Sequence, residues 1–346
     1  MGDASSPNEL ESDVYINQKI FQSSAITPAT RDFNLRLQEL ESRGQKWYEV
    51  GAAEYRRLRK AGLTPLPGAT LLPSATAFSV PSRDDNRSIP CRVLMPEHDS
   101  APQGIFMHIH GGGWVLNDET SSDLYLQKVA NAGSLVCLSV GYRLAPEHPF
   151  PAGPQDCFDV ATWLIDHGEE EFGTSLKFVG GESAGANLAL LAALDLLRSP
   201  NSTYSSVRLK GVLLHYGAYS LQWHASTRHF KKQPSLILDE DLLNHFRAAY
   251  LPSTGSEDWS APEISPFYAD LSNLDLPPAF ISCGTEDCLL EDSVFMGVRW
   301  MIAGGEAVVK CYPGSPHGFI LFSEEVHDNT RIAMSHLATF INSKCA

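Results

Sequence analysis

Short, nearly continuous apolar runs alternate with amphipathic stretches from about Thr70 to the C-terminus, and this alternation strongly constrains the fold. Apolar runs without polar alternation are typical of strands that are buried on both faces. Amphipathic stretches between them are typical of helices that cover a sheet. The sequence therefore predicts an α/β fold with a mostly parallel, eight-stranded sheet covered by helices on both faces. The strand candidates are residues 69–80, 88–95, 104–110, 134–142, 176–181, 209–217, 278–284 and 307–314.

Two segments depart from this alternation. Residues from Thr30 to Leu63 carry apolar positions at helical spacing, which predicts one or two amphipathic helices before the sheet. A long insertion rich in Trp, His, Tyr and Pro separates the strand near Gly217 from the strand near Pro278. Insertions of this length in a compact domain are commonly functional lids. We therefore expect an N-terminal helical segment (1–69), a main domain (70–346) and a cap insertion at about 223–262, with the N-terminal segment contributing to the cap.

The composition of the chain limits the binding partners and the cellular compartment that can be expected for the protein. The chain has 346 residues and a formal net charge of -15, which argues against nucleic acid or an anionic membrane surface as a partner. No apolar stretch approaches the length of a membrane span, and the N-terminus shows no secretory signal pattern. The seven scattered cysteines form no CxxC pair and favour a reducing compartment over a disulfide framework. A cytoplasmic protein is the expectation.

The strongest motif for chemistry is the pentapeptide Gly181-Glu182-Ser183-Ala184-Gly185, between an apolar strand and a long apolar helix. A GxSxG sequence in that context is typical of a nucleophile elbow, a sharp turn that exposes the serine hydroxyl. The helix N-terminus that follows favours negative charge. Small residues are common at strand–helix turns, so the pentapeptide by itself also fits a purely structural turn. Its context favours Ser183 as a nucleophile.

A glycine run, His110-Gly111-Gly112-Gly113-Trp114, directly follows another strand. Successive glycines leave backbone N–H groups open to a substrate oxygen, and together with the N–H of Ala184 they form a candidate oxyanion hole. A flexible turn is the structural alternative. The carboxyl end of a sheet strand, however, is where α/β proteins bind ligands.

A serine nucleophile needs a base, and His317 follows the last predicted strand at the same end of the sheet as Ser183. The order serine, acid, histidine along the chain is the one expected of the fold. His108 and His110 share one face of a strand, but they lack further ligands at metal spacing. Structural roles are therefore expected for both, with His110 bracing the glycine run. His215 and His224 flank the insertion and are candidates for pocket lining.

The acid that orients the histidine is expected after the seventh strand, where four carboxylates gather. A solvated loop is the structural alternative for this segment. Asp287 is the preferred candidate, and Glu286 and Asp292 remain open as alternatives. The carboxylate is needed to hold the imidazole in the right tautomer and to stabilise the imidazolium.

With these motifs in order, the chain resembles the hormone-sensitive-lipase-like carboxylesterases of the α/β-hydrolase superfamily from about Ser88 to the C-terminus. The motifs that carry the resemblance are HGGGW at His110, YRLAPEHPFPA from Tyr142 to Ala152, GESAG at Gly181, DCLLED at Asp287 and PHGF at Pro316. The resemblance implies an α/β-hydrolase fold with a helical cap, no cofactor and no metal, and a possible homodimer. It also implies an oxyanion hole of Gly112, Gly113 and Ala184.

The same resemblance implies that Asp287 is the acid that orients the histidine. The acid of the family begins a D-x-L motif, which is matched here by Asp287-Cys288-Leu289. The chain departs from the family pattern at Cys288, where proline is usual. It departs again at Glu291-Asp292, where the family has Asp-Glu. In the Tyr142–Ala152 stretch, which has the character of a structural loop, Arg143 and Glu147 are expected to pair.

The function expected from these residues is that of a serine hydrolase, which cleaves a carboxylic ester of a small or medium apolar substrate through an acyl-enzyme. Trp223, Phe230, Tyr250 and Trp259 in the insertion are candidates for an apolar lining, or for packing within the lid. The alternative function is that of a lyase, dehydratase or cyclase on the same fold, in secondary metabolism. A receptor is the third hypothesis and is ranked last. HGGGW is also similar to the HGGxW of aryl formamidases, which implies amide or formamide hydrolysis as a smaller alternative.

Overall fold

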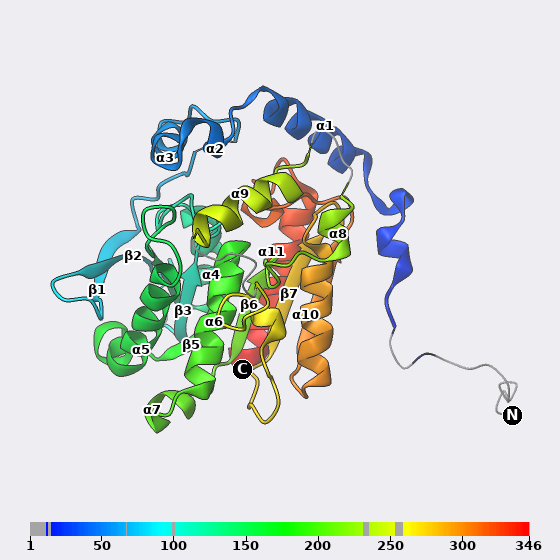
Figure 1. The fold of residues 1–346 in the computed structure, drawn as a ribbon. Helices are drawn as coiled ribbons and strands as arrows, with labels where there is room; N and C mark the ends of the chain where they lie inside the picture. The colour runs from blue at the N-terminus through cyan, green and yellow to red at the C-terminus, as the bar shows by residue number, and fades with distance from the viewer. Residues whose placement is uncertain are drawn as a thin grey trace, which may run out of the picture.

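The structure is a computed structural model that describes residues 12, 15–66, 68–98, 101–230, 235–252 and 259–345. Its centre is one eight-stranded sheet in the order β1-β2-β4-β3-β5-β6-β7-β8 (Figure 1). The strands are β1 (Thr76–Pro81), β2 (Ser88–Leu94), β3 (Gly104–Ile109), β4 (Leu135–Val140), β5 (Leu176–Glu182), β6 (Gly211–His215), β7 (Ala279–Gly284) and β8 (Ala307–Tyr312).

The sheet is parallel except at one edge. β1 pairs antiparallel with β2, and β2 pairs antiparallel with β4, whereas all the remaining neighbours are parallel. The mostly parallel α/β sheet, predicted from the alternation of apolar runs, is therefore confirmed. Its antiparallel edge begins with β1 and β2, which follow each other without an intervening helix. Because β3 to β8 are parallel, their carboxyl ends meet at one edge of the sheet, and each of the motifs singled out above follows one of these ends.

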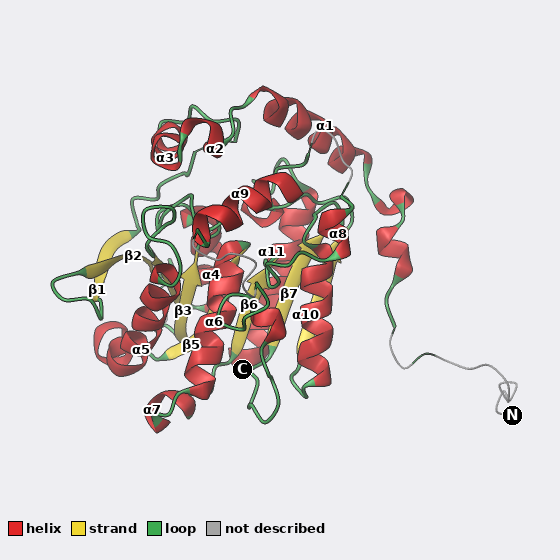
Figure 2. Ribbon diagram, in the orientation of Figure 1, coloured by secondary structure: helices red, strands yellow, loops and turns green. Residues whose placement is uncertain are grey.

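Helices cover both faces of the sheet (Figure 2). They are α4 (Asp123–Gly133), α5 (Ala152–Phe172), α6 (Ala184–Arg198), α7 (Ser202–Ser205), α10 (Leu290–Ile302) and α11 (Asp328–Cys345). On β3, Ile109 and Met107 belong to the core shared with α5, α6 and α10. Phe106 points the other way, into the core shared with α4 and α11. This alternation explains why the strand has no polar face.

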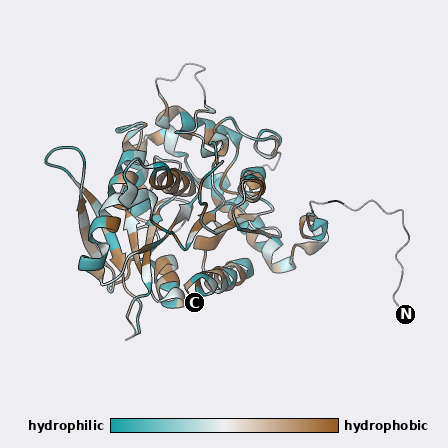
Figure 3. Ribbon diagram, turned by 90° about the horizontal axis from the view of Figure 1, so that it is seen from below, coloured by the Kyte–Doolittle hydropathy of each residue, from teal (hydrophilic) through white to brown (hydrophobic). Residues whose placement is uncertain are grey.

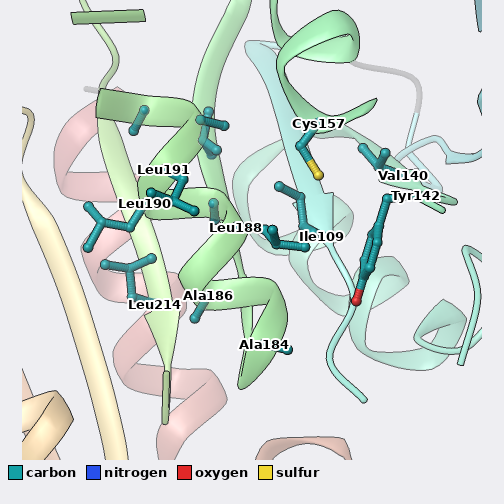
Figure 4. Close-up of a cluster of buried hydrophobic side chains, with 14 of the residues drawn as sticks. Ile109, Val140, Tyr142, Cys157, Ala184, Ala186, Leu188, Leu190, Leu191 and Leu214 are labelled. Carbon is teal, nitrogen blue, oxygen red and sulfur yellow. The ribbon is translucent and has the colours of Figure 1, made fainter. Parts of the chain in front are cut away.

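The larger core lies between the sheet and α6. Figure 4 shows Leu188 and Leu191 of α6 beside Ile109 of β3 and Leu214 of β6. α6 is apolar almost all round and is nearly fully buried, as expected of a helix in the centre of a layered domain. Figure 3 shows the apolar residues concentrated inside the molecule and the polar ones toward its outside. This buried helix begins directly at Ser183, so the core anchors the proposed nucleophile.

The described residues of the N-terminal segment form three α-helices, where one or two were expected between Thr30 and Leu63: α1 (Pro28–Arg43), α2 (Trp47–Val50) and α3 (Ala52–Lys60). α1 begins with Thr27, whose hydroxyl accepts the N–H of Thr30, followed by a proline in the first turn. Two short 3-10 turns, η1 (Gln18–Phe21) and η2 (Ser23–Ala25), precede it. The three helices arch across the side of the molecule where α9 lies (Figure 1).

The described residues of the insertion between β6 and β7 carry little regular structure. They form α8 (Ala225–Arg228), α9 (Glu240–Tyr250) and the 3-10 turn η3 (Pro266–Tyr268). Another 3-10 turn, η4 (Phe319–Leu321), follows β8. Asp239 begins α9 by accepting the N–H of Leu242 with its carboxylate.

Candidate active site

Ser183 stands at a strained turn between β5 and α6. Its backbone has φ 57° and ψ -121°, a conformation that side-chain-bearing residues rarely adopt. Cβ atoms placed on Gly181 and Gly185 would lie 2.1 and 2.0 Å from the carbonyl oxygen of Ile109 in β3. Only glycine fits at both places. The two glycines of the GxSxG sequence thus let the turn pack tightly against the neighbouring strand, and this packing stabilises the strained serine.

Three side chains from separate loops form one hydrogen-bonded chain. His317 Nε2 lies 2.9 Å from Ser183 Oγ, and His317 Nδ1 lies 2.8 Å from Asp287 Oδ2. The other carboxylate oxygen of Asp287 accepts the N–H of Leu289 at 2.9 Å, which holds the carboxylate in place. Asp287 and His317 are buried, and Ser183 is partly exposed. The structure therefore brings together a hydroxyl, an imidazole and a carboxylate in the order of a catalytic triad.

Backbone contacts between the loops after β7 and β8 explain how Asp287 and His317 meet. The N–H of Glu286 donates to the carbonyl of Ser315 at 3.1 Å, and the N–H of Thr285 donates to the carbonyl of Tyr312 at 3.0 Å. A Cβ on Gly284 would lie 2.0 Å from the Ser315 oxygen, so the two loops are in direct backbone contact. The acid and the histidine are thus held on paired loops rather than on independent ones.

The two alternative acids lie elsewhere. Asp292 is buried in the first turn of α10, and its Oδ1 accepts the N–H groups of Tyr219 and Ser220 at 2.9 Å each. Asp287 is the carboxylate that accepts the hydrogen bond from His317 Nδ1, and Glu286 contributes its backbone N–H to the loop pairing. The geometry around His317 therefore favours Asp287 among the carboxylates of this segment.

The glycine loop, which we define as residues 110–117, lies against the serine turn. A Cβ on Gly111 would lie 3.2 Å from Ser183 Cβ, and Gly112 and Gly113 have positive φ values of 116° and 61°. Within the described part of the chain, the N–H groups of Gly112 and Gly113 donate no hydrogen bond. Two backbone donors beside the serine are the kind of group that stabilises an oxyanion.

The side chain of His110 holds the glycine loop in place. Burial lowers the pKa of His110 to about 4, so the ring is neutral and donates from Nδ1 to the carbonyl of Gly111 at 2.8 Å. Its ring stacks on Tyr142 with centroids 4.3 Å apart, and the Tyr142 hydroxyl donates to the His110 carbonyl at 3.0 Å. Asn117 donates to the same Gly111 carbonyl at 3.1 Å. The interpretation that His110 braces the glycine run is confirmed.

The structure gives other residues roles that differ from the expected ones. Arg143 does not pair with Glu147: its guanidinium donates to Asp156 at 2.9 Å, whereas Glu147 accepts two hydrogen bonds from Arg56 of α3. That expectation is wrong because the nearest cation to Glu147 comes from the N-terminal segment, which is distant in sequence.

The two histidines that flank the insertion also differ in their surroundings. His215 is fully buried and bonds to Tyr125 and Ser282, so it does not line a pocket. His224 is half-buried against the rings of Phe267 and Phe295. Within the described ranges, no group of three or more His, Cys, Asp or Glu side chains is placed to hold a metal ion.

Aromatic residues of the insertion mostly pack rather than line a cavity. Tyr250 stacks on Trp114 with centroids 4.7 Å apart, and the buried Trp223 donates to Asn244 at 2.9 Å. Trp259 lies under the guanidinium of Arg247 at 3.5 Å. For these residues the packing alternative fits the structure better than the lining alternative.

Phe246 in α9 was missed by the sequence reasoning, although it contacts the glycine loop. A Cβ on Gly113 would lie 2.3 Å from the Phe246 ring, so this ring lies directly against the Gly113 backbone. Phe246 also stacks on Trp47 of α2, with centroids 5.3 Å apart. The only signal in the sequence was its apolar position on an amphipathic helix, which any core residue shares.

The sheet topology, the serine turn and the order of the three side chains define an α/β hydrolase. The profile of the family described as "alpha/beta hydrolase fold" matches residues 106–321, and the chain belongs to this family. The resemblance to carboxylesterases of the α/β-hydrolase superfamily is confirmed as well, since relatives named carboxylesterase and acetyl esterase match the chain. No helix among the described residues is long and apolar enough to cross a membrane.

Three known proteins illustrate the similarity. An AB hydrolase superfamily protein of Schizosaccharomyces pombe is 31% identical over 263 residues, which cover 73% of this chain and 76% of that protein. Carboxylesterase NlhH of Mycobacterium tuberculosis is 31% identical over 252 residues, covering 69% of this chain and 74% of that protein. A solved esterase from the archaeon Pyrobaculum calidifontis matches with a TM-score of 0.75 at 29% identity. The match covers 89% of this chain and 97% of the esterase chain.

Proposed function

We propose that Ser183, His317 and Asp287 form the catalytic triad of this carboxylic-ester hydrolase, with Gly112, Gly113 and Ala184 as its oxyanion hole. The observation that carries the proposal is the unbroken chain of hydrogen bonds from Ser183 Oγ through the imidazole of His317 to the buried carboxylate of Asp287. The similarity of the chain to named esterases supports it.

In the first half of the reaction, Ser183 Oγ attacks the ester carbonyl carbon while its proton passes to His317 Nε2. His317 Nδ1–H donates to Asp287 throughout, which selects the tautomer whose Nε2 is free to accept a proton. The carbonyl oxygen becomes an oxyanion and accepts hydrogen bonds from the oxyanion-hole N–H groups. When this intermediate collapses, the bond to the alcohol oxygen breaks, and His317 returns its proton to that oxygen.

In the second half, water replaces the alcohol. His317 removes a proton from the water, the hydroxide oxygen attacks the acyl carbon, and a second oxyanion forms in the same hole. Its collapse breaks the bond to Ser183 Oγ, which recovers its proton from His317, and the carboxylic acid leaves. No cofactor enters the balance of atoms or charges.

We also propose that the N-terminal segment (1–69) and the insertion at about 223–262 form a cap over the domain 70–346. Supporting contacts join the two parts: Trp47 stacks on Phe246, and the Tyr48 hydroxyl donates to Asp241 at 3.1 Å. Because the Phe246 ring lies against Gly113, the cap delivers an apolar surface next to the proposed oxyanion hole. This supports a small or medium apolar ester as substrate.

Two further expectations concern the surroundings of the enzyme. All seven cysteines are free thiols and five of them are buried, which supports a reducing cytoplasmic compartment. The resemblance supports a homodimer, which sedimentation equilibrium can distinguish from a monomer. For the alternative of a lyase, dehydratase or cyclase we find no favouring observation, since the relatives named above for an activity are esterases.

The decisive experiment combines labelling and turnover. The protein is treated with a fluorophosphonate probe and assayed on aryl esters of increasing acyl length, with Ser183→Ala and the exposed-site control Ser206→Ala. We expect labelling and hydrolysis to fall on the order of thousandfold or more in Ser183→Ala only. Hydrolysis that survives Ser183→Ala would refute the triad, and lyase or cyclase turnover that survives it would favour the alternative.

A further inference from the structure

We propose that Glu182, the residue before the nucleophile, is a positioning residue that holds the glycine loop at a fixed spacing from Ser183. The inference rests on the proposed function, because the spacing matters only if Ser183 attacks and the loop binds the oxyanion. Nothing in the triad chemistry requires a carboxylate at this position of the GxSxG sequence. The Glu182 side chain, however, contacts the glycine loop that carries two of the proposed oxyanion-hole donors.

The Glu182 side chain is 3% exposed, and each of its carboxylate oxygens has a hydrogen-bond donor. Oε2 lies 2.7 Å from His108 Nε2 in β3. Oε1 accepts the hydroxyl of Ser122 at 3.1 Å and the N–H of Gly111 at 3.4 Å. One carboxylate therefore joins three separate elements: the strand before the glycine loop, the loop itself and the residue before α4.

The charge of this carboxylate is compensated locally. Burial by itself raises the pKa of Glu182, but the electrostatic attraction and the hydrogen bond of His108 outweigh burial, and the pKa is lowered overall. His108 Nδ1 in turn lies 3.0 Å from the Ser139 hydroxyl in β4, which orients the ring. The neighbouring His215 bonds to Tyr125 and Ser282 instead, so His108 is the histidine that contacts the Glu182 carboxylate.

Packing shows the same coupling independently of the hydrogen bonds. A Cβ on Gly111 would lie 2.7 Å from the Glu182 carbonyl oxygen and 3.2 Å from Ser183 Cβ. The backbone of Gly111 therefore rests directly on the serine turn, and the Glu182 carboxylate holds the N–H of the same residue. Any shift of this carboxylate moves Gly111, and with it the adjacent Gly112 and Gly113.

This arrangement predicts an effect on the transition state rather than on substrate binding. The oxyanion exists only after Ser183 attacks, so a misplaced glycine loop weakens an interaction that the bound ester does not yet make. Removing one oxyanion donor lowers kcat by about 100- to 1000-fold in other serine hydrolases. Displacing the donors without removing them has a smaller effect, for which we expect a decrease of about 10- to 100-fold.

The test compares Glu182→Gln with Ser122→Ala in the full chain. Glu182→Gln keeps the shape but removes the charge, whereas Ser122→Ala removes one donor and leaves the His108 pair intact. For an aryl acetate we expect kcat to fall about 10- to 100-fold in Glu182→Gln and several-fold in Ser122→Ala, with KM within about threefold. The Ki of a trifluoromethyl ketone, which forms a tetrahedral adduct on the serine, is expected to rise by the same factor as kcat falls.

Asp156→Asn is the matched control, because Asp156 is also a fully buried, salt-bridged carboxylate but pairs with Arg143 and Arg87. We expect it to lower the thermal midpoint and leave kcat and the Ki of the ketone within about twofold. If Glu182→Gln folds with unchanged kcat and ketone affinity, the inference is wrong. If Glu182→Gln does not fold, Ser122→Ala decides, and unchanged kinetics in that variant overturn the inference. Hydrolysis in Ser183→Ala would instead overturn the proposed function.

Discussion

Asp292 lies five residues after Asp287 and shows how differently two neighbouring carboxyls can be used. Its Oδ1 accepts two backbone N–H groups of the segment that leads from β6 into the insertion. Its Oδ2 has no hydrogen-bond partner among the described residues. Burial raises the pKa of Asp292 to about 8, although the two backbone hydrogen bonds lower it, so the carboxyl carries a proton at neutral pH.

This raised pKa predicts a pH-dependent stability. The unfolded chain releases the Asp292 proton near pH 4, whereas the folded chain keeps it until about pH 8. The stability contributed by Asp292 is therefore fully present below about pH 4 and is lost as pH rises toward 8, by up to about 1.4 kcal/mol per pH unit. The side chain of Asp292→Asn cannot titrate. The free energy of unfolding of the variant, minus that of the wild type, is therefore expected to increase as pH rises.

Urea unfolding of both proteins at pH 5, 6, 7 and 8 measures this difference. Tyr219 and Ser220 can still donate to the amide oxygen of the asparagine, so the comparison isolates the charge. Parallel stability curves for the two proteins across this range would show that Asp292 is ionised in the folded state, contrary to the assignment.

The side chain of Arg56 joins α3 to the loops that follow β3 and β4. Arg56 donates to the carbonyls of Val115 and Ala145 at 2.7 and 2.8 Å, and its guanidinium forms a two-bond ion pair with Glu147. Val115 follows the proposed oxyanion-hole glycines by two residues. The arginine therefore fastens the N-terminal helices to the glycine loop and to the loop after β4 at once.

We expect Arg56→Met to loosen the N-terminal helices. The variant removes four charge-assisted hydrogen bonds while keeping an apolar stem, and we expect it to lower the free energy of unfolding by about 2–4 kcal/mol. Faster amide hydrogen exchange is expected in α1 to α3 before any change in the sheet. Arg57→Met is the matched control, since Arg57 is exposed and, in the part of the chain that the structure describes, its guanidinium pairs only with Glu54 of its own helix. Equal protection of α1 to α3 in the two variants would refute this role of Arg56.

For the whole molecule, the proposed division between an N-terminal segment and a main domain has a testable consequence. Trp47 of α2 is 8% exposed and covers Phe246, and Leu37 of α1 is also buried. Residues before 70 therefore shield apolar surface that belongs to the rest of the chain. None of the described residues before residue 70 belongs to a strand of the sheet.

We expect the chain 70–346 to keep the fold of the sheet but to lose stability and activity. Its far-UV circular dichroism should retain the α/β character, its thermal midpoint should fall, and its binding of an apolar dye should increase because Phe246 loses its cover. A truncated chain with the thermal midpoint and ester turnover of the full protein would show that the N-terminal segment is no part of the cap.

The sequence by itself determined the features that depend on local order along the chain. Apolar runs alternating with helices specify a parallel sheet, because a strand covered on both faces has no place for polar residues. Ser183 and His317 were recognisable because each stands directly after a predicted strand, and the carboxyl ends of parallel strands meet at one edge. Local order alone left three carboxylates as candidates for the acid.

Only the tertiary structure decided the contacts between residues that are far apart in sequence. The pairing of the loops after β7 and β8 brings Asp287 to His317, whereas Asp292 is turned toward the backbone of Tyr219. The hydrogen-bond partners of Glu182 and Arg56 also lie on other elements, and no local sequence pattern predicts them. The physical reason is that strand and helix periodicity depends on neighbours in the chain, whereas hydrogen bonding and burial of a side chain depend on which loops the folded sheet brings together.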